Sequence, residues 1–85
     1  PNMNENIRQF IVQLLLEKGS IPEGLSIDDY RYLDTGHIDS LSFIKFIFRV
    51  EEQFGIRFGA SDISGSEIRT IGGLIRIIQS NIATP

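Results

Sequence analysis

The chain has 85 residues and a formal net charge of −3, and it contains no cysteine and one histidine, His37. A chain this short encloses one small core, which predicts a single domain over residues 1–85 without a deep catalytic cleft. The lack of cysteine excludes disulfides and cysteine metal sites, and the acidic balance argues against nucleic acid as a partner. We give residues 1–3 no structural role and expect them to be disordered or foreign to the domain.

An apolar stripe with helical spacing lies near the start of the chain. Its members follow the i, i+3, i+4, i+7, i+8 pattern: Ile7, Phe10, Ile11, Leu14 and Leu15. This spacing predicts a first helix with one buried face. Asn4 or Asn6 is the expected cap, and Gly19 is the expected end.

Residues 19–39 show no long periodicity. A connection of this length is uncommon in a small domain and is usually functional. Five apolar residues lie within it: Leu25, Ile27, Tyr30, Tyr32 and Leu33. They predict an ordered crossover packed on the helices, with a helical turn near Ser26 to Tyr30.

A second helix is predicted from Ser40 to Gln53, ended by Phe54 and Gly55. Its apolar residues sweep an arc of roughly 200°, which is wider than an ordinary core stripe. Either this helix is central in the fold, or one flank of it, at Phe43 or Phe46, meets a partner. The stretch 41–50 is interrupted by two basic residues and is too short to span a bilayer, which takes ~20 apolar residues.

Two further helices complete the predicted fold. Residues 61–68 suggest a short helix weakened by Gly65, and Thr70 is the expected cap of a last helix. The buried face of this last helix consists of Ile71, Leu74, Ile75, Ile78 and Ile82. Gly72 and Gly73 lower its intrinsic stability, so packing must hold it. The predicted fold class is all-α: a bundle of three main helices and one short helix, with a long first loop.

The segment from Leu33 to Leu41 carries the chemistry. Its sequence, Leu-Asp-Thr-Gly-His-Ile-Asp-Ser-Leu, leads directly into the second helix. Ser40 therefore sits in the first turn, where free backbone N–H groups and the helix dipole favour a phosphate. By cap preference alone, Asp39 or Ser40 could simply cap the helix.

This segment resembles the attachment site of acyl carrier proteins, in which a Gly-x-Asp-Ser-Leu motif opens the second helix. The resemblance extends over nearly the whole chain and includes the long first connection and the Glu-Glu-Gln-Phe-Gly-Ile sequence at residues 51–56. Two residues, His37 and Ile38, separate Gly36 from Asp39. This spacing is similar to that of D-alanyl carrier proteins and other specialised stand-alone carriers.

The resemblance implies that Ser40 carries 4′-phosphopantetheine, taken from coenzyme A by a separate phosphopantetheinyl transferase. The Mg²⁺ that the reaction needs belongs to the transferase, and no metal is expected on this chain. Asp39 would help to place the serine and engage the transferase or its metal, and Leu41 would anchor the start of the helix. The second helix would be the docking surface for partner enzymes, through Leu41, Phe43, Ile44, Lys45 and Arg49.

The function implied is that of a monomeric, cytoplasmic carrier that is not an enzyme. It would take acyl or aminoacyl thioesters from a loading ligase or transferase to downstream enzymes of fatty acid or secondary metabolite biosynthesis. The alternative is an interaction module with the same fold that is never modified. A hydrolytic triad of His37, Asp39 and Ser40 is the weakest hypothesis, because groups so close in sequence cannot easily form the required relay.

Overall fold

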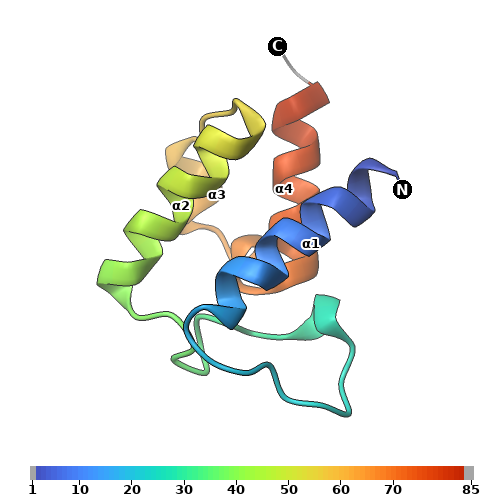
Figure 1. Ribbon diagram of the computed structural model, residues 1–85. Coiled ribbons are helices and arrows are strands. Elements are labelled where there is room, and N and C mark those ends of the chain that lie inside the picture. The colour runs from blue at the N-terminus through green and yellow to red at the C-terminus, as the bar shows by residue number, and fades with distance from the viewer. Residues whose placement is uncertain (1, 84–85) are drawn as a thin grey trace.

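The computed structural model describes residues 2–83, which fold into four α-helices and two 3₁₀ turns (Figure 1). The α-helices are Met3–Leu16 (α1), Ser40–Phe54 (α2), Ala60–Ser64 (α3) and Ile71–Ala83 (α4), and the turns are Ile27–Asp29 (η1) and Glu67–Arg69 (η2). No strand occurs in this part of the chain, so the predicted all-α fold is confirmed. None of the helices within residues 2–83 is long and apolar enough to cross a membrane.

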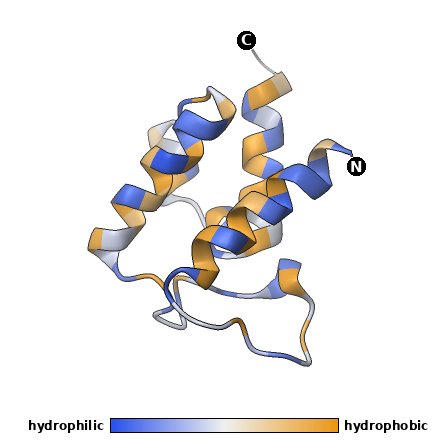
Figure 2. Ribbon diagram, in the orientation of Figure 1, coloured by the Kyte–Doolittle hydropathy of each residue, from blue (hydrophilic) through white to orange (hydrophobic). Residues whose placement is uncertain are grey.

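The centre of the fold is α4. The wide apolar arc of α2 therefore does not mean that α2 is the central helix. Helix α4 contacts α1, η1 and η2. Its buried residues run almost without interruption: Ile71, Gly72, Gly73, Leu74, Ile75, Ile77 and Ile78. Along α1 and α2, by contrast, hydrophobic and hydrophilic residues alternate (Figure 2), because each of these helices covers the core with one face only.

Helix α1 buries the predicted stripe, with Ile7, Ile11 and Leu15 fully enclosed. Its cap, however, is neither Asn4 nor Asn6. The side chain of Asn2 accepts a hydrogen bond from the backbone N–H of Glu5 at 2.9 Å. The helix thus begins a full turn before its first buried residue, and residues 2 and 3 belong to the folded region, contrary to expectation. Pro1 lies outside the described residues.

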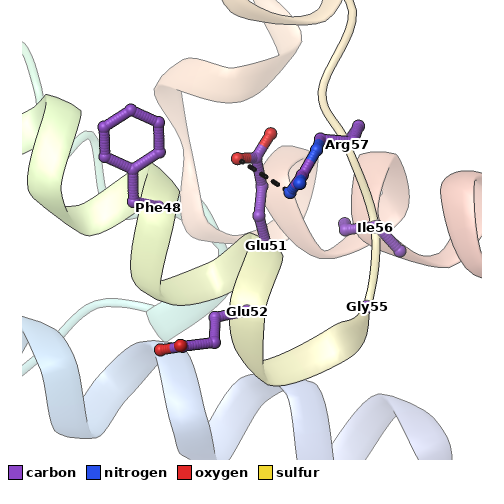
Figure 3. A pocket seen from close by; sticks show the side chains of 6 residues that line it. All are labelled: Phe48, Glu51, Glu52, Gly55, Ile56 and Arg57. Carbon is purple, nitrogen blue, oxygen red and sulfur yellow. Dashed lines mark ion pairs between the residues drawn. The ribbon is translucent and has the colours of Figure 1, made fainter.

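Helix α2 ends as predicted, at Gly55. This glycine has φ +65°, a left-handed conformation that a side chain would strain. The chain that follows is held by Glu51, which the sequence analysis did not single out. The Glu51 carboxylate is buried and accepts a hydrogen bond from the backbone N–H of Phe58 at 2.9 Å. Figure 3 shows Arg57 approaching the same carboxylate, with 3.9 Å between the ion-pair atoms.

The predicted helix over residues 61–68 is two elements. The backbone at Gly65 is extended, with ψ 172°, and this residue separates α3 from η2. We expected Gly65 only to weaken this helix, but the helix ends completely at this residue. The N-terminus of α3 is closed by Asp62, whose carboxylate accepts the backbone N–H of Gly59 at 2.9 Å.

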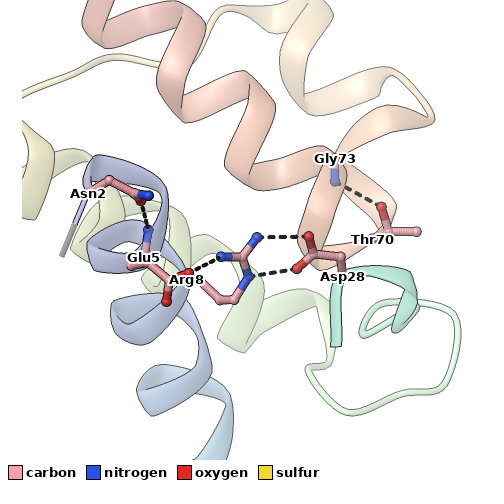
Figure 4. A network of polar contacts seen from close by, with 6 residues as sticks. All are labelled: Asn2, Glu5, Arg8, Asp28, Thr70 and Gly73. Carbon is pink, nitrogen blue, oxygen red and sulfur yellow. Dashed lines mark hydrogen bonds and ion pairs between the residues drawn. The ribbon is translucent and has the colours of Figure 1, made fainter. Parts of the chain in front are cut away.

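The connection between α1 and α2 is ordered and packs on the core, as predicted. Arg8 donates two hydrogen bonds to Asp28, at 2.8 and 2.9 Å, which ties η1 to α1 (Figure 4). The Tyr32 hydroxyl donates to the carbonyl of Ile68, and the carbonyl of Tyr30 accepts from the N–H of Ile71. Burial raises the pKa of Tyr32. At the tip of the connection, residues 22–27 are exposed throughout.

Helix α4 begins where η1 and η2 press against it. Thr70 is the cap, as predicted, and its hydroxyl accepts the N–H of Gly73 at 3.0 Å (Figure 4). A Cβ on Gly73 would lie 1.7 Å from the Glu67 carbonyl oxygen, and one on Gly72 would lie 3.0 Å from Asp28. The two glycines therefore permit a close approach of three backbone segments, which explains their presence in a helix.

Candidate functional site

The segment that leads into α2 places Ser40 at the surface. Gly36 turns the chain with φ +77°, and Ile38 is buried, with 4% of its surface exposed. The N–H of Ile38 donates to the carbonyl of Tyr32 at 3.3 Å. After this anchor the chain comes out of the core, so Asp39 and Ser40 are both exposed. Ser40 is the first residue of the helix.

Asp39 caps α2. Its carboxylate accepts a hydrogen bond from the backbone N–H of Ser42 at 2.8 Å, and its carbonyl accepts the N–H of Phe43. The bonds from the backbone and hydroxyl of Ser42 lower the pKa of the Asp39 carboxyl. Since Asp39 is the cap, the hydroxyl of Ser40 is not needed for that role.

We expect acid to weaken this cap. Because the pKa of Asp39 is lowered in the folded state, the carboxylate stabilises the fold above pH ~4, and this contribution is lost as the pH falls through the folded-state pKa. Asp39→Asn retains a good cap without a titrating group. Urea unfolding at pH 7 and pH 3 should therefore show the wild type losing stability relative to Asp39→Asn on acidification. The same difference between the two proteins at both pH values would contradict this prediction.

His37 is held at the end of α1, although it lies in the loop that precedes α2. It is half-buried, and its Nε2 atom lies 2.7 Å from the carbonyl oxygen of Leu15, at the end of α1. Its Nδ1 atom lies 2.8 Å from the Tyr30 hydroxyl. Since a carbonyl can only accept, Nε2 carries a hydrogen and donates it. Both ring nitrogens are thus engaged away from Ser40, which argues against the hydrolytic triad and gives His37 the role of tying the segment to α1.

The outer side of α2 presents apolar side chains to solvent. Leu41 is 69% exposed, Ile44 54% and Phe48 64%. Ile63 of α3 borders them and is also exposed. We call these four residues the apolar patch. A hollow of about 130 Å³ adjoins it, lined by Phe43, Ile44, Ile47, Phe48 and Ile63.

Of the two phenylalanines that one interpretation placed on a partner-facing flank of α2, Phe46 is buried and Phe43 is half-buried. Phe46 is 4% exposed and packs against Tyr32, with ring centroids 5.6 Å apart. Phe43 is half-buried against the core. The helix does have an apolar flank in solvent, and this flank contains Leu41, Ile44 and Phe48, of which Phe48 was not predicted as a docking residue. Periodicity gives the width of an apolar arc but not which part of it the neighbouring helices cover.

The two basic residues predicted on α2 have different surroundings. Arg49 donates to the carboxylate of Glu17 at 2.7 and 3.2 Å, which joins α2 to the end of α1 and lowers the pKa of Glu17. Lys45 is exposed and forms no ion pair within residues 2–83. Both line a hollow of about 140 Å³ between the two helices.

A larger hollow of about 570 Å³ lies at the C-terminal end of α2 (Figure 3). It is lined by Phe48, Glu51, Glu52, Gly55, Ile56 and Arg57. Its acidic groups do not form a metal site: residues 2–83 contain no group of three or more histidine, aspartate and glutamate side chains suited to hold an ion.

One comparison with known proteins identifies a relationship. A family model described as "Phosphopantetheine attachment site" matches residues 9–78. No curated protein and no solved structure matches the chain. The matched range includes the segment from Leu33 to Leu41 and all of α2.

Proposed function

The chain belongs to the family of phosphopantetheine attachment domains, which carry covalently bound 4′-phosphopantetheine, and on this premise we propose that Ser40 is the attachment residue. The observation that carries the proposal is the position of Ser40, exposed at the first residue of a helix whose cap is already provided by Asp39. The arm's thiol would hold an acyl or aminoacyl group as a thioester.

The residues around Ser40 fit such a group. The first N–H groups of a helix have no partner within the helix, and the dipole places partial positive charge beside them. The phosphodiester formed at the Ser40 hydroxyl is therefore favoured at this position. Asp39, as the cap, fixes the start of α2 and so positions the hydroxyl. Leu41 does not anchor the helix by burial, since it is exposed, and so it acts at the surface.

Carrier domains of this family are not catalytic themselves, and their partners are a phosphopantetheinyl transferase and pathway enzymes. We propose that these partners dock on the apolar patch together with Phe43 and Lys45. Exposed apolar residues beside a modification site mark a surface that is covered in a complex. Arg49 is engaged with Glu17, so it takes part only if that ion pair opens.

Intact mass tests the function directly. The chain is incubated with coenzyme A, Mg²⁺ and a phosphopantetheinyl transferase of broad specificity, with another carrier protein in the same tube as control. We expect a gain of one phosphopantetheine group, mapped to Ser40 by peptide analysis. No gain while the control is modified would instead support an unmodified interaction module.

The docking surface can be tested with the same transferase. Ile44→Asp places a charge in the centre of the apolar patch and is expected to raise KM about tenfold, the effect of losing ~1.4 kcal/mol at an interface hot spot. Leu25→Asp is the matched control, because Leu25 is also exposed but lies in the first connection. Equal KM values for the two variants would show that the patch does not contact the transferase.

A further inference from the structure

The hollow between α1 and α2 has a composition that suggests a ligand. Three buried apolar side chains, Leu14, Ile38 and Phe46, line it, and each has no more than 5% of its surface exposed. Its volume of about 140 Å³ is close to that of a cavity that holds one benzene-sized molecule, ~150 Å³. An apolar floor with a few polar groups at the rim is typical of small-molecule sites.

The rim of this hollow is positively charged. The chain has only two lysines, Lys18 and Lys45, and both line it. Neither forms an ion pair within residues 2–83. The other two charges at the rim, Glu17 and Arg49, neutralise each other through two hydrogen bonds. Lys18 also lies near enough to contribute to the lowered pKa of Asp39 and of Glu17, yet it remains outside ion-pair distance of both.

The hollow is close to the attachment site but does not include it. Ser42 lines the hollow, and it follows Ser40 by two residues, which turns it by about 200° around the helix axis. A phosphodiester on Ser40 therefore starts on a different side of α2 from Ser42 and the hollow. Because Ser40 is the first residue of α2, a group attached to it is not confined to one side of the helix. The far end of an extended arm, longer than the ~10–12 Å diameter of a helix, has access to the hollow.

We propose that the hollow lined by Leu14, Ile38 and Phe46 receives a short acyl cargo that ends in a carboxylate, and that Lys18 and Lys45 bind this carboxylate. The inference rests on the proposed attachment at Ser40. The methylene groups of such a cargo contact the apolar floor. Its carboxylate forms ion pairs with the two lysines at the rim, which have no other ion-pair partner within residues 2–83. The same lysines repel the ammonium group of an aminoacyl cargo. The entirely apolar hollow beside Phe48 contains no group that would select a charge.

The experiment measures the ionisation of the cargo itself. A transferase that accepts acyl-coenzyme A loads the chain with glutaryl-phosphopantetheine, ¹³C-labelled at the distal carboxyl, and NMR follows its titration. In the wild type we expect the carboxyl pKa to be lower by about half a unit or more than in free glutaryl-pantetheine, because opposite charges nearby favour the ionised form. Lys18→Met and Lys45→Met should each reduce the shift, and the double variant should abolish it.

The controls distinguish the effect of the two lysines on the carboxyl pKa from the effect of the protein's overall charge. Arg57→Met makes the same charge change at the opposite end of α2 and should leave the shift intact. The shift should decrease in high salt, because exposed charge pairs are screened. A carboxyl that titrates as in the free thioester, or a shift that persists in the double lysine variant, overturns the inference. Intact mass distinguishes the other failure: a chain that accepts no phosphopantetheine overturns the proposed function, and the inference with it.

Discussion

Replacement of Ser40 with alanine is expected to abolish attachment of phosphopantetheine completely and to leave the fold unchanged. The first outcome follows because alanine has no hydroxyl to form the phosphodiester. The second follows because Ser40 is exposed and the cap of α2 is formed by Asp39 and the N–H of Ser42. Intact mass after the transferase reaction measures the first, and the urea midpoint measures the second.

Ser42→Ala is the matched control for Ser40→Ala. It removes a hydroxyl two residues away in the same turn, and it should accept phosphopantetheine in full. Attachment to the Ser40→Ala variant would refute the site, and loss of attachment in Ser42→Ala alone would move it. A large fall in the urea midpoint of Ser40→Ala would contradict the assignment of the cap to Asp39.

Gly73→Ala is expected to have the largest effect on stability of any single methyl group added to this chain. The added carbon would lie 1.7 Å from the Glu67 carbonyl oxygen and 2.7 Å from the carbonyl carbon, so α4 and η2 must move apart. We expect a loss of about 3 kcal/mol or more in the free energy of unfolding. For a domain of this size the whole free energy of unfolding is only about 4–13 kcal/mol.

Gly59→Ala is the control for this substitution. Gly59 has φ −81°, and its nearest contact to an added Cβ would be Asp62 at 3.6 Å, an ordinary distance. Its urea midpoint should stay close to that of the wild type. If Gly73→Ala were as stable as Gly59→Ala, the close approach of η2 to α4 would not hold in solution.

The sequence predicts local structure well where a residue acts through its own backbone. The end of α2 at Gly55 and the cap at Thr70 both follow from conformational preferences of single residues. The position of Ser40 at the start of α2 is likewise local, since it needs only the helix boundary. The apolar stripe of α1 is confirmed for the same reason.

What the sequence does not predict depends on neighbours that are distant along the chain. His37 bonds to the carbonyl of Leu15, 22 residues earlier, and nothing in its local sequence indicates this partner. Phe46 is buried and Phe48 exposed, although both lie in the same apolar arc, because only one of them meets Tyr32. The burial of Glu51 could have been inferred from one signal in the sequence, because its carboxylate lies within the apolar arc of α2.

Some parts of the connection between α1 and α2 are exposed and others are packed on the core. This difference determines where additional residues can be inserted into the chain. Residues 22–26 are exposed, and Gly24 has φ +88° with open space around it. A peptide inserted between Glu23 and Gly24 would extend into solvent, and the entropy cost of closing the longer loop grows only slowly with its length. The same insertion between Tyr32 and Ile38 would separate a hydrogen-bonded pair that fixes Ser40 relative to the core. A reporter or a fused domain therefore belongs at the tip of this connection, where it leaves the attachment serine in place.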